Sequence, residues 1–193
     1  MTENQKADFN PLDILPGKAT KKRVKTDMVR VDHAGEFGAV EIYRGQAAVL
    51  SKASDHRDGY QKICHMGDQE KVHLGEFNKQ LPQRHIRPSM LSPLWKRGGF
   101  AMGALTALIS KESAMACTEA VETVIDGHYQ EQIAYFEKDS DPLTPTLEKF
   151  RQEELEHKEE AVEDGAQQAP FYKTTNFLIQ SLCKAVIKAA EKI

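Results

Sequence analysis

The sequence predicts an all-α protein, an antiparallel four-helix bundle followed by a shorter C-terminal helix. Long stretches of helix-forming residues are separated by segments rich in proline, glycine and aspartate, and few segments alternate as strands do. A pattern of glutamate and histidine at helical spacing also occurs twice. The 193 residues suit one domain with a sizeable core.

The N-terminal residues 1–24 are expected to form an irregular lead-in, and residues 25–193 a single bundle domain. Prolines and a glycine interrupt the lead-in, and the basic segment 18–25 should lead into the first helix. We expect that helix over about 25–53, ending at a polar turn around Ser54-Asp55.

The middle of the chain predicts two more helical regions. The first covers about 57–80 and ends before Pro82, because proline cannot continue the hydrogen bonding of a helix. After a proline-rich loop, an unusually long region is expected over about 94–139, up to the turn at 139–145. Four glycines interrupt this long region: Gly98, Gly99, Gly103 and Gly127.

The last part of the chain predicts a fourth bundle helix and a tail helix. Thr144 is expected to cap the fourth helix, with Pro145 at its first position, and the helix should run to about 167. Ala169-Pro170 then interrupts the chain, and the tail helix covers about 171–192.

The charge and the cysteines exclude several classes of protein. The net charge is −3, from 26 Lys and Arg against 29 Asp and Glu, which argues against a nucleic-acid partner. The three cysteines are far apart and form no CxxC motif, so neither a zinc ribbon nor a rubredoxin-type iron centre is expected. We expect free thiols.

The repeated pattern combines one glutamate on a helix with Glu-x-x-His on the next. Glu36 is followed 34 residues later by Glu70-Lys-Val-His73. Glu122 is followed 32 residues later by Glu154-Leu-Glu-His157. Because positions i and i+3 share one face of a helix, two such hairpins bring all six side chains to one point.

Four buried carboxylates are costly unless cations lie between them, so the pattern predicts a site for two divalent metal ions. It is the arrangement of ferritin-like di-iron and di-manganese proteins, and carboxylate with imidazole suits iron or manganese. A single Glu-x-x-His motif usually lies on a solvent-exposed helix face and binds nothing. Glu41 and Glu119 are also expected near the interior of the bundle and are competing candidates. Other acids crowd the second motif, and most should face solvent: Glu153, Glu156, Glu159 and Glu160.

Five segments resemble the demethoxyubiquinone hydroxylases of ubiquinone biosynthesis, and the resemblance extends over nearly the whole chain from about Met28. The segments are Val31-Asp-His-Ala-Gly-Glu36-Phe-Gly-Ala39, Asp68-Gln-Glu-Lys-Val-His73, Pro93-Leu-Trp95, Lys111-Glu-Ser-Ala-Met-Ala-Cys-Thr118 and Glu153-Glu-Leu-Glu-His157.

The resemblance implies O2-dependent hydroxylation of the demethoxyubiquinol ring at a carboxylate-bridged centre of two iron ions. The family's ligands fall on the six residues that the spacing indicates: Glu36, Glu70, His73, Glu122, Glu154 and His157. The family's His-Tyr pair falls on His128-Tyr129, a candidate redox relay or substrate contact, although such a pair is more often structural. Asp68 and Asp126 are candidate acceptors for the outer nitrogens of the ligand histidines.

The same resemblance implies partners and a location. NADH is expected as a direct reductant. The chain has no GxGxxG motif of the kind that indicates a nicotinamide-binding domain, so NADH would act without such a domain in this chain. The expected partners are a polyprenyl quinol, O2, a membrane surface, a second copy of the chain and a complex of ubiquinone biosynthesis. The N-terminal residues resemble neither a secretory signal nor a transit peptide, and we expect a peripheral protein on the cytoplasmic side of a bacterial inner membrane.

Two apolar segments are candidates for membrane contact. Residues 90–109 combine Trp95 with a glycine-rich run too short to span a bilayer. Residues 171–193 place an apolar stripe beside a lysine stripe, which fits an interfacial helix and equally an ordinary bundle helix. Gly99-x-x-x-Gly103 weakly indicates close helix packing.

Three other functions fit the same helices. A rubrerythrin-like peroxidase or a manganese catalase would use the same ligand types on a soluble substrate. A ferritin-like iron-storage protein would assemble a shell and load many ions per chain. A plain bundle without metal would tolerate the loss of His73 or His157.

Overall fold

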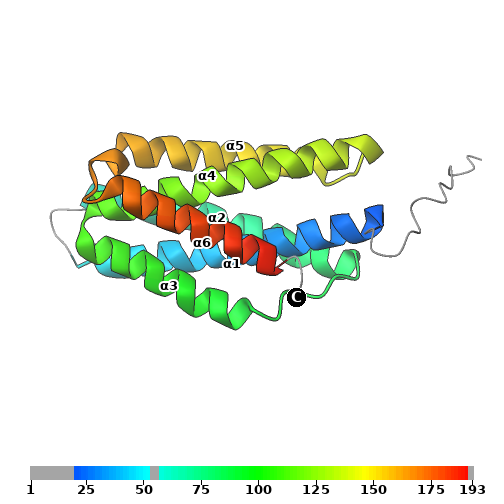
Figure 1. Ribbon diagram of the computed structural model, residues 1–193, viewed down its shortest axis with the longest axis horizontal. Coiled ribbons are helices and arrows are strands. Elements are labelled where there is room, and N and C mark those ends of the chain that lie inside the picture. The colour runs from blue at the N-terminus through cyan, green and yellow to red at the C-terminus, as the bar shows by residue number, and fades with distance from the viewer. Residues whose placement is uncertain (1–19, 53–56, 191–193) are drawn as a thin grey trace, which may run out of the picture.

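The computed structural model describes residues 20–52 and 57–190, and in these ranges every regular element is helical (Figure 1). The elements are α1 (Lys21–Leu50), α2 (Arg57–Gln83), α3 (Ser92–Ile109), α4 (Lys111–Phe136), α5 (Thr144–Glu163) and α6 (Tyr172–Ala190), with short 3-10 turns at Glu137–Asp139 and Ala166–Gln168. The predicted all-α class is confirmed.

Four of these helices, α1, α2, α4 and α5, surround a common interior, with α1 and α5 running in one direction and α2 and α4 in the other (Figure 1). The α1–α2 and α4–α5 hairpins are joined by one long crossover that contains α3, as in ferritin-like bundles. Helix α3 packs mainly on α1, and α6 packs mainly on α4. Both therefore lie outside the four-helix core.

The single helix expected over 94–139 is wrong, because this region forms two helices. Ser110 interrupts it with extended backbone, φ −170° and ψ 169°, and its hydroxyl accepts a hydrogen bond from the Ser113 N–H. Ser110 is thus an N-cap that starts α4. The glycines expected to interrupt the region lie inside α3 and α4 instead.

The first helix starts earlier than the predicted residue 25. Helix α1 begins at Lys21, capped by the Thr20 side chain, which accepts from the Arg23 N–H. Residues 1–19 and the turn expected at 54–55 lie outside the described residues. Helix α2 continues one residue past Pro82, although proline donates no hydrogen bond to the carbonyl four residues earlier.

The ends of α5 differ from the prediction as well. Thr144 is the first helical residue and makes no capping hydrogen bond, so its predicted role is wrong. The Asp141 carboxylate accepts from the Leu143 N–H at the preceding turn instead. At the other end, α5 stops at Glu163, short of residue 167, because Gly165 adopts a left-handed conformation with φ 96°. Helix α6 agrees with the prediction to within one residue at its start, and residues 191–193 are outside the description.

Helices α1 and α3 approach so closely that backbone lies against backbone. A Cβ atom at Gly103 would lie 2.0 Å from the Ile42 carbonyl oxygen, and one at Gly45 would lie 2.2 Å from the Phe100 carbonyl oxygen. A Cβ atom at Gly99 would lie 2.8 Å from a carbonyl oxygen of α1. The close packing predicted from Gly99-x-x-x-Gly103 is confirmed.

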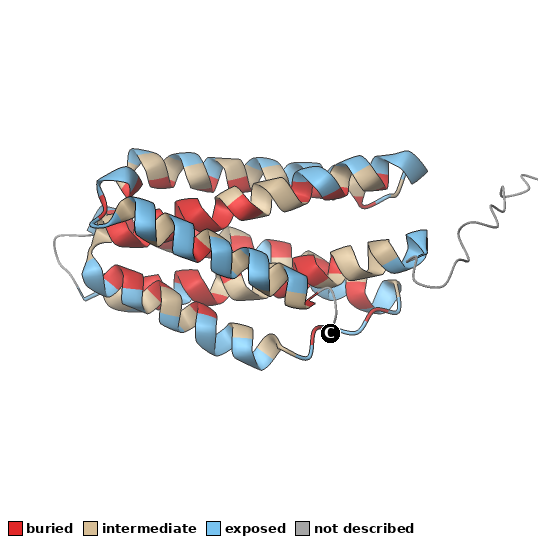
Figure 2. Ribbon diagram, viewed as in Figure 1, coloured by how far each residue is buried: buried red, intermediate tan, exposed pale blue. Residues whose placement is uncertain are grey.

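A polar layer separates the two largest apolar clusters of the described residues. Along α2, Ile63 and Met66 belong to one cluster and Phe77 and Leu81 to the other, with acidic residues and a histidine between them. Helix α5 repeats this order in reverse. Figure 2 shows the buried positions facing inward on all four bundle helices. The polar layer is therefore sealed by apolar side chains at both ends.

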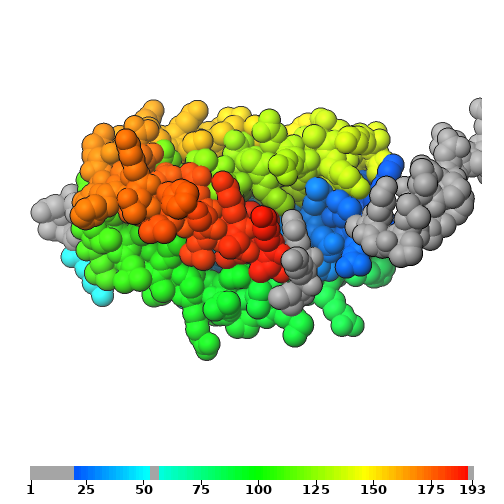
Figure 3. Space-filling view, in the orientation of Figure 1, coloured from blue at the N-terminus to red at the C-terminus, as the bar shows by residue number. Residues whose placement is uncertain are grey.

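The outer sides of α3 and α6 expose large apolar side chains. On the helices these are Leu94, Leu105, Leu108, Ile109, Phe177, Leu178 and Leu182, and Met90 and Phe171 are exposed just before α3 and α6. Figure 3 shows α6 lying across this face of the molecule, with side chains of α3 projecting below it. Among the described residues, no helix combines the length and the hydropathy that a membrane crossing requires.

The glycine contact between α1 and α3 gives a test of this packing. Gly103→Ala should destabilise the protein by about 1–3 kcal/mol, because the new methyl group meets backbone that cannot move aside. Gly98→Ala, on the same helix with open space at its Cβ position, should be neutral or stabilising by about 0.5–1 kcal/mol. Urea unfolding of both variants measures the difference, and equal stabilities would contradict the packing.

Candidate metal centre

The six residues predicted as ligands meet in the polar layer of the bundle. Each is at most 2% exposed. Helix α1 contributes one of them, α2 two, α4 one and α5 two: Glu36; Glu70 and His73; Glu122; Glu154 and His157. We call these six residues the carboxylate–histidine cluster. Residues as distant in the sequence as α1 and α5 are thus brought into contact.

The cluster divides into two overlapping groups, each with its ligand atoms within 4.8 Å of one another. The groups are Glu36, Glu70, His73 and Glu154, and Glu70, Glu122, Glu154 and His157. Because Glu70 and Glu154 belong to both, the arrangement suits two cations that share two carboxylates. We call the place beside Glu36 and His73 the first position, and the place beside Glu122 and His157 the second.

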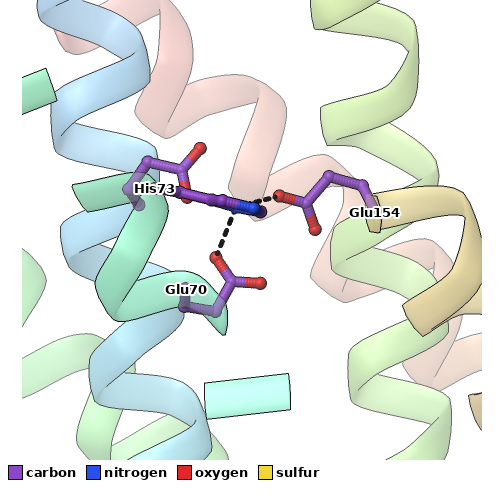
Figure 4. Close-up of side chains that lie close together, drawn as sticks. Glu70, His73 and Glu154 are labelled. Carbon is purple, nitrogen blue, oxygen red and sulfur yellow. Dashed lines mark hydrogen bonds and ion pairs between the residues drawn. The ribbon is translucent and has the colours of Figure 1, made fainter. Parts of the chain in front are cut away.

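Both histidines direct Nδ1 into the cluster. His73 Nδ1 lies 3.1 Å from Glu154 Oε1 and 3.5 Å from Glu36 Oε2. Figure 4 shows the His73 ring between Glu70 and Glu154. His157 Nδ1 lies 3.2 Å from both Glu70 Oε1 and Glu154 Oε2. The imidazoles are therefore oriented with one nitrogen toward the carboxylates.

The outer nitrogens of the two histidines bind side chains that the sequence analysis did not assign. His73 Nε2 lies 3.0 Å from Glu153 Oε2, and His157 Nε2 lies 3.0 Å from Gln69 Oε1. An Nε2–H that donates to these oxygens leaves the Nδ1 lone pair for the cluster. Each partner directly precedes the Glu-x-x-His motif, which is the sequence signal that was missed.

The expectation that Asp68 or Asp126 would fill this role is wrong. Asp68 is exposed and pairs with Lys71. Asp126 accepts from Arg151 Nε at 2.7 Å. Asp68 lies one residue before Gln69, the residue that contacts His157, and Asp126 is half-buried against Arg151 of α5.

Two tyrosines link the halves of the molecule reciprocally. Tyr43 on α1 donates to Glu122 on α4 at 2.7 Å, and Tyr129 on α4 donates to Glu36 on α1. Burial, followed by the nearby carboxylates, raises the pKa of both tyrosines well above its usual range, so both stay protonated donors. Tyr43 follows Glu36 by seven residues, and Tyr129 follows Glu122 by seven.

The repeat extends three residues further to Gln46 and Gln132, both fully buried. Gln46 donates to the Ala114 carbonyl, and Gln132 donates to Asp32. Each half thus carries the pattern Glu-x6-Tyr-x2-Gln, which was present in the sequence and would have indicated the tyrosines.

The cluster fits cations rather than a neutral polar core. Glu36 Oε2, Glu122 Oε2 and both oxygens of Glu70 are buried and receive no hydrogen bond. Burial raises the pKa of Glu36 and Glu122 well above its usual range. Although burial alone would lower the pKa of His157, its contacts with Glu154 and Glu70 raise it to about 10. The protein environment therefore demands positive charge here, and carboxylate with imidazole is a donor set for divalent iron or manganese.

The competing acids Glu41 and Glu119 are buried but belong to neither group. Glu41 pairs with Arg44 at 2.8 Å, and Glu119 accepts from the Tyr172 hydroxyl at 2.8 Å. Each of these two glutamates thus has a polar partner outside the cluster.

His128 and Tyr129 line a small cavity beside the first position. Its volume is 30 Å³, and Glu36 and Asp32 also line it. His128 Nε2 lies 3.0 Å from the buried Asp32 carboxylate, whereas Tyr129 contacts the cluster directly. The two members of the pair thus have different surroundings, and Tyr129 contacts Glu36, one of the six residues.

A larger apolar cavity of 290 Å³ adjoins the small one. It lies among α1, α3, α4 and α6, and its lining includes Trp95, Met102 and Leu182. The two cavities share Ala34, Gly35, Ile125, Val186 and Ile187. An apolar space therefore extends from the exposed faces of α3 and α6 toward Glu36.

The fold and the cluster define a class, a helical bundle with a candidate dinuclear metal centre in its core. The family model described as ubiquinone biosynthesis protein COQ7 matches residues 23–190, and the chain belongs to this family. This confirms the resemblance inferred from the motifs.

Curated relatives agree with this assignment. The chain is 43% identical over 181 residues to the 3-demethoxyubiquinol 3-hydroxylase of Rhodospirillum rubrum, covering 94% of this chain and 84% of that protein. It is 46% identical over 169 residues to the mitochondrial NADPH-dependent 3-demethoxyubiquinone 3-hydroxylase of Rattus norvegicus, covering 86% and 76%. The mitochondrial 5-demethoxyubiquinone hydroxylase of Saccharomyces cerevisiae is 43% identical over 181 residues, covering 86% and 77%.

Removal of one buried charge tests the cluster as a metal site. Glu122→Gln keeps the size of the side chain, so the metal-free variant should be at least as stable as the metal-free wild type. A metal ion at a free concentration of about 100 times its Kd raises the free energy of unfolding by about 2.7 kcal/mol. The variant should lose part or all of this metal-dependent stabilisation. Thermal unfolding with EDTA and with Mn²⁺ measures it.

Glu119→Gln is the matched control, because Glu119 lies one turn earlier on α4 and outside the cluster. This variant should keep the full metal-dependent rise in Tm. A rise that is undiminished in Glu122→Gln would show that Glu122 is not a ligand.

Proposed function

We propose that this protein hydroxylates the ring of a demethoxyubiquinol with O2, at a centre of two iron ions, in ubiquinone biosynthesis. The single observation that carries the proposal is a buried cluster with two shared carboxylates, in a chain of the COQ7 family whose curated relatives are named demethoxyubiquinone hydroxylases. The other ferritin-like chemistries remain outcomes of the experiment below.

Under this proposal, Glu36 and His73 hold one ion, Glu122 and His157 hold the other, and Glu70 and Glu154 bind both. Bound ferrous iron supplies the electrons and the oxygen activation that hydroxylation of the ring requires. Gln69 and Glu153 orient the histidines by accepting their Nε2–H groups. Tyr43 and Tyr129 hold the terminal carboxylates, and the apolar clusters at both ends exclude water.

The adjoining cavities give the substrate a route that matches its chemistry. The 290 Å³ apolar cavity suits the beginning of a polyprenyl chain, and the 30 Å³ cavity at Glu36 lies where the ring would meet the cluster. His128 and Tyr129 line this inner end, and we propose them as a redox relay or as contacts to the ring.

Reducing equivalents are proposed to come from a reduced nicotinamide nucleotide. The expectation from the sequence is NADH, and the rat relative is named NADPH-dependent. Both nucleotides therefore belong in the assay.

The substrate's tail also accounts for the exposed apolar faces of α3 and α6. We propose that these faces dip into the cytoplasmic side of a bacterial inner membrane, so that the quinol enters the cavity from the lipid. Lys96, Arg97 and Lys188 are exposed on the same helices and suit anionic headgroups. The alternatives to a membrane are a second copy of the chain or a protein of the biosynthetic complex, either of which would cover the same faces.

An isotope experiment tests the proposed reaction. Iron-loaded protein would receive NADH or NADPH, ¹⁸O2 and a demethoxyquinone with a short isoprenoid tail, and mass spectrometry would identify the product. One ¹⁸O atom in the ring would establish the hydroxylase. His73→Ala should abolish the product, whereas Lys71→Ala, exposed on the same helix, should retain it.

The negative outcomes separate the alternatives. Two bound ions with peroxide consumption and no ring oxygen would indicate a rubrerythrin-like peroxidase, or a manganese catalase if manganese is required. Loading of many iron ions per chain would indicate storage. Full turnover by His73→Ala would show that the ligand assignment is wrong.

Flotation with liposomes tests the membrane face. Replacing two exposed leucines, Leu108→Asp on α3 and Leu178→Asp on α6, should move most of the protein from the vesicle fraction to the soluble fraction, because burying each carboxylate in the interface is costly. Neither leucine lines the cavities, so turnover of a short-tailed substrate should persist.

Val72→Asp is the matched control, because Val72 is similarly exposed on α2, outside the α3 and α6 faces. This control should float as the wild type does. Equal flotation of all three proteins would contradict the proposed membrane face, and a change from dimer to monomer in the double variant would assign the face to a second copy.

A further inference from the structure

The contacts around the carboxylate–histidine cluster repeat across the two halves with one informative exception. Each terminal glutamate accepts from a tyrosine of the opposite half, and each histidine binds the residue that precedes the opposite Glu-x-x-His motif. These preceding residues differ in charge. His73 binds the carboxylate of Glu153, whereas His157 binds the neutral amide of Gln69.

The charge of Glu153 is only weakly compensated by its other neighbour. Its second oxygen, Oε1, lies 3.4 Å from Lys149 Nζ, and the Lys149 side chain is 63% exposed, so water screens that pair. Its Oε2 faces His73 Nε2 at 3.0 Å, and the Glu153 side chain is 20% exposed. Most of the effect of this carboxylate is therefore directed at the His73 imidazole.

We propose that Glu153 makes the two metal positions unequal, so that the first position (Glu36, His73) binds its ion more tightly than the second (Glu122, His157). The inference rests on the proposed dinuclear centre. A charged acceptor on Nε2–H increases the electron density at Nδ1 and strengthens imidazole as a ligand more than a neutral amide does. Partners of this kind are typically worth about 10- to 100-fold in metal affinity.

A second difference between the halves lies on the same side of the cluster. His128 and Asp32 form a close pair beside Glu36, with His128 Nε2 3.0 Å from the Asp32 carboxylate, and both line the cavity there. The corresponding positions of the other half, four residues before Glu122 and six residues after Glu36, are Thr118 and Ile42. The first position is thus the one that adjoins both the cavity and the Asp32–His128 pair, and under this inference the ion at the second position is the more exchangeable of the two.

Titration of the metal-free, full-length protein with Co²⁺ tests the inference without an activity assay. Isothermal calorimetry and the visible absorption of bound Co²⁺ should resolve two steps in the wild type. Glu36→Gln should remove the tighter step and Glu122→Gln the weaker one, which assigns the steps to the positions.

The exchange of the two outer partners is the decisive comparison. Glu153→Gln should weaken the tighter step about 10- to 100-fold and bring the two steps together. Gln69→Glu should tighten the weaker step, and the double variant Gln69→Glu/Glu153→Gln should restore two separate steps with their positions exchanged. All three changes preserve the size of the side chain.

Glu159→Gln is the control for net charge, because it removes the same charge from an exposed place on α5. The inference would be overturned if Glu153→Gln bound two ions with unchanged affinities, or if both affinities fell equally as in this control. Either result would leave the proposed metal centre intact. Absence of Co²⁺ binding by the wild type would overturn the proposed centre itself together with the inference.

Discussion

The structure depends on the burial of four carboxylates and two imidazoles in the middle of a helical bundle. Such a group is stable only where positive charge compensates it and where neighbouring groups hold each oxygen in place. The protein meets the second requirement with Tyr43, Tyr129 and the apolar clusters on both sides of the polar layer. The first requirement is left to cations, so the same burial that needs compensation makes this layer a candidate metal site.

A sealed polar centre creates a problem of access, which the two helices outside the bundle resolve. Helix α3 lies against α1 at glycine-to-backbone distance, so the two helices leave no room for side chains along their contact. Further along, the same helices diverge from α4 and α6 around the apolar cavity. The four bundle helices can therefore remain tightly packed around the cluster, while α3 and α6 form the path toward it and expose apolar side chains at its outer end.

The extent to which the sequence predicts this structure follows from the range of the interactions. Glu70 and His73 share a helix face whatever surrounds them, and the repeat of this motif after a single glutamate predicts the set of six residues that the fold brings together. The break at Ser110 was missed because an N-cap depends on one hydroxyl and one backbone N–H, whereas the flanking residues all favour helix. The outer partners Glu153 and Gln69 were missed because they act across the bundle, where the rotation of each helix decides which neighbour of a ligand faces inward.

The near symmetry of the two halves explains both the stability of the cluster and its use. Matching Glu, Tyr, Gln and Glu-x-x-His residues let each half complete the other, which suits two ions of equal charge in one layer. A substrate that enters through one cavity meets only one side of that layer, however, and a fully symmetric centre would treat both ions alike. The departures from symmetry at Asp32, His128 and Glu153 all lie on the side of Glu36 and His73, which is the side that the cavity reaches. A reaction that takes place on one side of the cluster therefore requires the two halves to differ on that side. The tyrosines and the shared carboxylates, which hold the cluster together, can remain paired.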